Sequence, residues 1–284
     1  MKKMMEKVLV TAVILLALFV MEGTATAQLN QPLHQDGWIS AAAHAPGLHG
    51  SIWRTDIWIY CKSGSWSVDL YFGRSGQDNT DVIPFHIEAE GGAHVLHFED
   101  VVEQFLEVGA GAWVGSIHYT SDFQIQVWAR VYSISPDGRH SYGQVIQGIP
   151  TADMSPDVPT EGYSRVHQHL CAMKHTADGR FRVNIGILNP TGVAAYYRVE
   201  MFGPDGNYSL PGLPSSIPVE VPPYSMMQLS DPFAAINGGD WDNAIIQVLC
   251  DTVGAGTLAY ASVVDNNTND AYFTPAFKVL SPDD

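Results

Sequence analysis

An internal repeat is the feature of this sequence that most constrains its fold. Four segments of the first half recur in the same order in the second half, at offsets that drift only from 128 to 132 residues. The matching pairs are 53–60 with 181–188, 72–76 with 202–206, 98–102 with 229–233, and 127–132 with 259–264. Such self-similarity indicates one structural unit used twice. We therefore expect two domains, residues 28–150 and 165–284, joined by an extended, polar, proline-containing linker at 151–164.

Within each copy, hydrophobic and polar residues alternate with a period of two, which is typical of strands with one buried face. Turn-forming sequences at 135–138, 203–206 and 266–269 separate these runs. The side chains expected to face the core are Trp53, Thr55, Ile57, Ile59, Trp66, Val68, Leu70, Phe72, Ile125, Val127, Ala129, Val131, Phe181, Val183, Ile185 and Ile187. The sequence therefore predicts an all-β fold of two tandem immunoglobulin-like β-sandwich domains.

One short helix is expected in each copy. Asp100 precedes a helical stretch at 101–106, and Asp231 precedes Pro232. Aspartate is a favoured N-cap residue, and proline is favoured at the first helical position. Each helix would connect two strands near the end of its sandwich.

The first 27 residues read as a secretory signal peptide. Three lysines precede an apolar run at 8–21, and an Ala-Thr-Ala sequence ends at Ala27. The run is shorter than the roughly 20 residues that span a bilayer. We therefore expect cleavage after Ala27, a mature chain without a membrane span, and a secreted or periplasmic location.

The composition excludes several classes of partner. The chain carries 14 Lys and Arg against 30 Asp and Glu, a formal net charge of −16. This balance disfavours non-specific binding to nucleic acid, which requires cationic side chains to displace phosphate counterions. The hydrophobic content of 46% excludes a disordered chain. We expect no nucleic-acid partner, and we interpret the acidity as a solubility feature.

Catalytic motifs give no positive indication of an enzyme. The sequence contains no Gly-x-Ser-x-Gly elbow, no His-Glu-x-x-His and no glycine-rich phosphate loop. It therefore favours a non-enzymatic protein without a cofactor. Carboxylate-based glycoside hydrolysis stays open as an alternative, because acidic residues are abundant and Glu88 and Glu90 share a strand face.

The cysteine count is odd. Of Cys61, Cys171 and Cys250, only the last two fall in the same half of the chain. They are the only plausible pair within one domain, and the sequence leaves their pairing open.

Aromatic and polar side chains alternate with the expected core residues of the first copy. Rings exposed on a sheet can stack on sugar rings, and exposed apolar patches often mark an interface. The second copy lacks two of these rings, with Gly186 and Leu188 at the places of Trp58 and Tyr60. We predict either packing against the second domain or binding of a glycan or surface protein. The residues of this candidate site are Arg54, Asp56, Trp58, Tyr60, Tyr71, Trp128, Arg130 and Tyr132.

A second hypothesis is a metal site. His167 and His169 are two residues apart and would share a strand face, and Cys171 and His175 follow closely. These ligand types suit zinc. The alternative is a polar surface strand that leads into a loop.

The chain also resembles an uncharacterised group of exported bacterial proteins. Residues 43–60, AHAPGLHGSIWRTDIWIY, resemble their opening AHxPGxxGSxWRTD motif, and residues 181–190, FRVNIGILNP, resemble a second FRTNxGxxNP motif. Residues 260–270 are similar to their closing YxSVVDNxTxD motif. The resemblance implies β-sandwich modules at the cell surface and brings no catalytic residues. This sequence departs from the group at Tyr60-Cys61, where Asn-Pro is usual.

Overall fold

The computed structural model describes residues 33–47, 50, 52–62, 64–90, 95–105, 112–135, 137–154, 163–203, 216–235, 239–268 and 270–282. The predicted signal peptide at 1–27 and residues 155–162 of the predicted linker lie outside the described residues. Residues 34–284 form one compact unit by their contacts. Among the residues described, no helix is long and apolar enough to cross a membrane.

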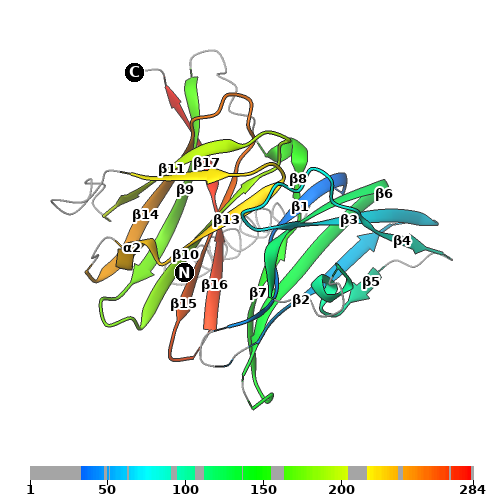
Figure 1. Cartoon of the computed structure of the whole chain (residues 1–284), viewed down its shortest axis with the longest axis horizontal. Coiled ribbons are helices and arrows are strands. Elements are labelled where there is room, and N and C mark those ends of the chain that lie inside the picture. The colour runs from blue at the N-terminus through cyan, green and yellow to red at the C-terminus, as the bar shows by residue number, and fades with distance from the viewer. Residues whose placement is uncertain are drawn as a thin grey trace, which may run out of the picture. The chain divides into compact units, whose positions relative to one another are not determined.

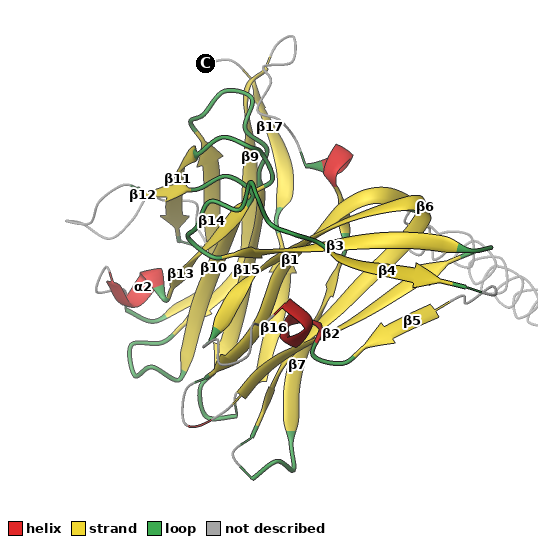
Figure 2. Cartoon of the chain, turned by 45° about the vertical axis from the view of Figure 1, so that its right-hand side comes forward, coloured by secondary structure: helices red, strands yellow, loops and turns green. Residues whose placement is uncertain are grey.

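The predicted all-β fold class is confirmed: antiparallel strands make up most of the described chain, with only short helical turns between them (Figures 1 and 2). The first half, residues 34–154, contains β1 (His34–Pro46), β2 (Ile52–Cys61), β3 (Trp66–Arg74), β4 (Phe85–Ala89), β5 (Val95–Phe98), η2 (Val101–Phe105), β6 (Trp113–Ile134), β7 (Ser141–Gln147), β8 (Ile149–Pro150) and η3 (Thr151–Asp153). The second half, residues 163–282, contains β9 (Tyr163–His175), β10 (Phe181–Asn189), β11 (Ala195–Phe202), β12 (Ile217–Val221), β13 (Ser225–Ser230), α2 (Pro232–Ala235), β14 (Trp241–Cys250), β15 (Leu258–Asp265), β16 (Asp270–Pro275) and β17 (Phe277–Pro282).

The two halves repeat one set of strand pairings. In the second half, one sheet has the order β12-β11-β14-β9-β17 and the other β13-β10-β15-β16. In the first half, β4-β3-β6-β1-β8 and β5-β2-β6-β7 are the corresponding series. The 22-residue strand β6 belongs to both series, since residues 115–121 pair with β3 and residues 125–134 pair with β2. Strand β6 therefore takes the places of both β14 and β15, and the sequence repeat coincides with a repeat of pairings.

The strand order is not that of an immunoglobulin domain. There the first two strands lie in the same sheet, whereas β9 and β10 lie in opposite sheets. The immunoglobulin-like prediction is wrong in this respect, because alternation of polar and apolar residues reveals strands and their buried faces but not their neighbours.

Alternate residues of β2, β3 and β10 fill the core, whereas β1 and β15 are buried over continuous runs of residues. Both sheets of the second half contribute to a single hydrophobic cluster, in which Val183, Ile185 and Ile187 of β10 are fully buried. In the first half, Ile57 and Ile59 of β2 are equally buried. The predicted core face is thus confirmed for these strands. In the second half the core lies between two separate sheets, whereas the strands of the first half belong to one eight-stranded sheet.

Two residues predicted to face outward are nevertheless buried. Asp56 is 7% exposed, because its carboxylate accepts hydrogen bonds beneath the start of η2. Leu188 is fully buried, because the outer face of β10 packs against the first half.

The halves share part of their core and a set of hydrogen bonds. Leu188, Met226, Leu258 and Tyr260 of the second half belong to the hydrophobic cluster of the first half. Residues 75–79 also lie against the turn before β13: the backbone N–H of Gly76 donates to the carbonyl of Met226 at 3.1 Å, and the Asn79 amide donates to the carbonyl of Tyr224 at 3.1 Å. Removal of either half would therefore expose apolar surface of the other.

The short helices after Asp100 and Asp231 are both present, but the capping prediction is wrong. Both aspartates have positive φ, 45° and 46°, whereas an N-cap residue is typically extended. The Asp100 carboxylate instead meets Arg54 and His44.

The cysteines form no disulfide in the described part of the chain. The thiol of Cys250 donates to the carbonyl of Thr252 at 3.5 Å. Cys171 lies before the irregularity of β9 and is partly exposed.

Candidate functional site

The outer face of β2 and β6 in the first half carries a row of rings. Trp58 of β2 lies directly opposite Trp128 of β6, and Trp58 also lies opposite His97 of β5. Gln147 of β7 is opposite Trp128 and extends the row across a fourth strand. We call this surface, together with Tyr60, Gln126 and Arg130 on the neighbouring positions, the aromatic face.

The Trp58 ring is held by a neighbouring ring, and both tryptophans of the aromatic face remain accessible. The indole of Trp58 stacks on the His97 ring, with centroids 4.5 Å apart and planes 7° from parallel. Trp58 and Trp128 are both partly exposed. A ring that is already held in this way loses little conformational entropy when a ligand stacks on it.

Polar groups border the rings. The Arg130 guanidinium lies over the Tyr132 ring at 4.6 Å and donates to the Ser141 hydroxyl at 3.0 Å. Gln126 lies opposite Tyr60. Amide and guanidinium groups beside an aromatic surface can hydrogen-bond the hydroxyls of a stacked sugar.

The second half contacts the opposite side of these same strands. Gln144 of β7 accepts a hydrogen bond from the Ser262 hydroxyl at 3.2 Å, and Trp53 and Val131 line a cavity shared with the second half. Because strand side chains alternate between faces, Trp58, Trp128 and Arg130 point away from that junction.

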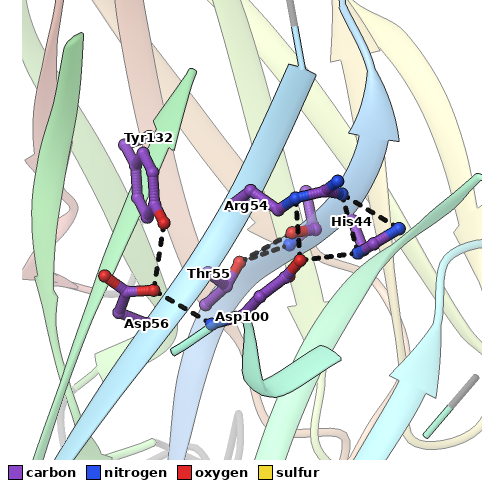
Figure 3. A network of polar contacts seen from close by, with 7 residues as sticks. His44, Arg54, Thr55, Asp56, Asp100 and Tyr132 are labelled. Carbon is purple, nitrogen blue, oxygen red and sulfur yellow. Dashed lines mark hydrogen bonds and ion pairs between the residues drawn. The ribbon is translucent and has the colours of Figure 1, made fainter. Parts of the chain in front are cut away.

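Three of the predicted site residues are occupied by an internal polar network at one end of the aromatic face (Figure 3). The Nε atom of Arg54 lies 2.8 Å from the Asp100 carboxylate, and Nδ1 of His44 lies 2.8 Å from the same oxygen. One Oδ atom of Asp56 accepts from the backbone N–H of Asp100 at 3.0 Å and from the Tyr132 hydroxyl at 3.2 Å.

The protonation states in this network follow from burial and pairing. Burial raises the pKa of Asp100, and the opposing effects of Arg54 and His44 do not cancel it. Burial, together with Asp56, raises the pKa of Tyr132 to about 12, so the phenol stays protonated and donates. The network holds η2 against β2 and presents little free hydrogen-bonding capacity to a ligand.

The second half contains an altered copy of this network. Arg182 of β10 corresponds to Arg54, and Asp231 corresponds to Asp100. His175, the last residue of β9, takes the place of His44, which lies two residues before the end of β1. His175 Nε2 lies 3.4 Å from Asp231, but Nη1 of Arg182 is buried and has no hydrogen-bond partner among the described residues. The close arginine–aspartate contact of the first half is therefore not repeated between Arg182 and Asp231 in the second half.

Tyr71 lies apart from the other predicted residues. It belongs to β3, in the other sheet series, where its ring lies 5.4 Å from His118. Together with Trp38 and Tyr224 these residues line a separate cavity of about 230 Å³. His118 stacks on Trp38 at 4.4 Å, and its Nε2 lies 2.8 Å from Asp36.

The predicted metal ligands are not brought together. The rings of His167 and His169 stack 6.2 Å apart on one face of β9. Ala172, with φ of 62°, interrupts the strand, and His175 beyond it is buried with Nδ1 3.0 Å from the carbonyl oxygen of Gly239. Among the described residues no group of three His, Cys, Asp or Glu side chains is arranged to hold a metal ion.

The carboxylates considered for glycoside hydrolysis lie at a sheet edge. Glu88 of β4 is 72% exposed and lies 3.6 Å from His86, which also contacts Asp69 at 2.6 Å. Glu90 follows the end of β4. Glu88 and Glu90 line a shallow surface pocket together with His86 and Asp122.

Residues that sequence reasoning missed fall into two groups. His97, Gln126 and Gln147 join the aromatic face through strand register, which alternation alone does not reveal. His44 and Asp100 did carry a signal, since the first lies in the opening motif and the second aligns with Asp231 across the repeat.

Fold and site together define an all-β protein of packed antiparallel sheets with one open aromatic sheet face. No protein-family model matches the chain, and no curated protein matches it. Among solved structures, a lectin from Pleurotus ostreatus in complex with GalNAc shares 8% identity at a TM-score of 0.20, covering 89% of this chain and 86% of the lectin. A protein named BspA_C_mut shares 10% identity at a TM-score of 0.18, covering 78% and 83%. Similarity this low identifies no relative.

Proposed function

We propose that this chain is an exported, non-enzymatic binding protein that uses the aromatic face of its first half to hold a glycan. The signal-peptide pattern at 1–27 and the resemblance to exported bacterial proteins support a site of action outside the cytoplasm. The two halves would act as tandem β-sandwich modules, of which the first carries the ligand site.

The observation that carries this proposal is the cross-strand pair Trp58–Trp128. Large rings on a rigid sheet offer apolar contact to the C–H face of a sugar, with Gln126 and Arg130 beside them for its hydroxyls. The second half has no such pair, since Gly186 and Tyr260 occupy the equivalent positions and Tyr260 is buried.

The surroundings of the face favour binding over hydrolysis. Two carboxylates flanking a glycosidic bond are required for the usual glycosidase mechanisms. Two carboxylates at one end of this face, Asp56 and Asp100, are buried and already accept hydrogen bonds or an ion pair within the fold.

A glycan array tests the proposal. We expect the wild-type mature chain to bind a defined set of glycans, and Trp58→Ala and Trp128→Ala to abolish the signal. Tyr196→Ala is the matched control, because Tyr196 is 55% exposed on the second half. Unchanged binding in both tryptophan variants would refute the assignment of the site.

A further inference from the structure

A cavity of about 510 Å³ lies between the two halves, on the side of β2 and β6 opposite the aromatic face. Its volume lies in the range of small-molecule binding pockets. The lining residues are Ala41, Ala42, Ala43, Ala45, Pro46, Gly47, Trp53, Val114, Val131, Gln144, Arg182, Asn184, Met226, Gln228, Ser230, Tyr260, Ser262 and Val264.

The two walls of this junction cavity differ in chemistry. The wall from the first half is mostly apolar, with three alternate alanines of β1 and the indole of Trp53. The wall from the second half carries a polar row across three strands, in which Ser230, Asn184 and Ser262 lie side by side. Gln228 and Ser230 are exposed to solvent, so the cavity is open along β13.

Arg182 supplies the only charge among these described lining residues. Nη1 of Arg182 is buried without a hydrogen-bond partner in the described chain, and a buried donor that is left unsatisfied is costly. The equivalent arginine of the first half, Arg54, lies 2.8 Å from Asp100. The difference between the copies leaves donor capacity at Arg182 that a bound anion can use.

The charge of the lining is opposite to that of the chain. The protein has 30 acidic and 14 basic residues, yet no Asp or Glu is among the described residues that line the junction cavity. Asp231 interacts electrostatically with Arg182 but is not one of these lining residues. The lining itself therefore offers one positive charge, which favours an anionic ligand.

We propose that the junction cavity binds an acidic sugar, a pyranose that carries a carboxylate. The carboxylate pairs with the Arg182 guanidinium, whose planar donors match it. The apolar face of the ring lies against Trp53 and the β1 alanines, and the hydroxyls meet Asn184 and Gln144. This site is separate from the aromatic face and does not depend on the proposed function.

Titration calorimetry on the full mature chain tests this site, with D-galacturonate as the probe and D-galactose as its neutral counterpart. We expect saturable galacturonate binding at least 10-fold tighter than galactose binding, and at least 10-fold weaker galacturonate binding by Arg182→Gln. The control is Arg180→Gln, since Arg180 is 55% exposed and outside the cavity lining.

Several results would overturn the assignment: no saturable binding of galacturonate, equal affinity for both sugars, or equal loss in the two arginine variants. If Arg182→Gln does not fold, the ratio of the two wild-type affinities decides the question. Trp58→Ala is expected to bind galacturonate normally, so failure at this cavity and failure at the aromatic face are distinguishable.

Discussion

Asp100 shows how much of this fold depends on single side chains. It combines a positive φ of 45°, which few residues other than glycine, asparagine and aspartate tolerate, with an ion pair to Arg54 at 2.8 Å. Its counterpart Asp231 repeats the backbone conformation. Because both aspartates share this φ, the turn before the helix, and not the ion pair, is the feature that the two halves have in common.

The raised pKa of Asp100 gives a signed prediction. A carboxyl group whose folded-state pKa lies above its unfolded value contributes stability below the unfolded pKa, and this contribution is lost as the pH rises through the folded value. Asn keeps the φ tolerance and does not titrate. We expect the stability of wild type relative to Asp100→Asn, measured by urea unfolding, to fall as the pH rises from about 4 to 7. A rise over that range would show that the ion pair outweighs the burial cost.

Gly186 makes room for a neighbouring ring. A Cβ atom at this position would lie 1.9 Å from the Tyr260 ring, which is buried against β10. Gly186→Ala must therefore displace the ring, and we expect a loss of about 2–3 kcal/mol in the free energy of unfolding. Gly239→Ala is the control, because no atom lies within 4 Å of its added Cβ. Equal stability of the two variants would refute this role of Gly186.

The sequence predicted the burial of some individual residues correctly and that of others incorrectly. Ile57, Ile185 and their alternating neighbours were identifiable, because burial on one face leaves a period-two pattern. The burial of Asp56 was not identifiable, because it depends on the backbone N–H of Asp100, which is 44 residues away in sequence.

Strands β3 and β4 illustrate how pairing creates local electrostatics. Asp69 lies directly opposite His86, and their side chains meet at 2.6 Å. Neither residue drew attention in the sequence, because cross-strand register is set by tertiary structure. The pair lies at the edge of the sheet series, where its charges face solvent.

We expect His86 to titrate above the ordinary histidine pKa, because the hydrogen bond to Asp69 favours the protonated ring. The resulting stabilisation is present below the unfolded pKa and is lost as the pH rises through the folded value. Titration of the His86 Cε1 proton by NMR measures this pKa directly. Asp69→Asn is expected to lower it, and no change in that variant would exclude Asp69 as the cause.

The long strand β6 shows why the sequence repeat predicts the strands but not the sheets to which they belong. Its two ends pair with different series, as β14 and β15 do separately in the second half. Polar and apolar residues alternate in the same way in both arrangements. The sequence therefore does not show whether one strand continues through both series or ends between them.

For the whole molecule, the junction joins two similar units that share part of their core. Leu188 and Met226 of the second half are fully buried among residues of the first. The repeat predicted two similar units, but it did not predict this shared core, because the outer face of β10 is apolar only at a few positions. The same junction forms the cavity around Arg182.

Leu188→Ala tests the shared core. Truncation of a fully buried leucine typically costs about 2–5 kcal/mol, and we expect urea unfolding, followed by tryptophan fluorescence and far-UV circular dichroism, to shift as a single transition. Val253→Ala is the control, with Val253 88% exposed. Two transitions, of which only one shifts, would show that the halves unfold independently.

We propose that the first half binds glycans through Trp58 and Trp128. Affinity electrophoresis in gels that contain soluble polysaccharides measures this directly, with mobility in a gel without polysaccharide as the reference. We predict that wild type and Tyr196→Ala are retarded in at least one polysaccharide gel, whereas Trp58→Ala and Trp128→Ala run as in the reference gel. Retardation of both tryptophan variants to the same extent as wild type, or no retardation of wild type in any gel, would contradict it.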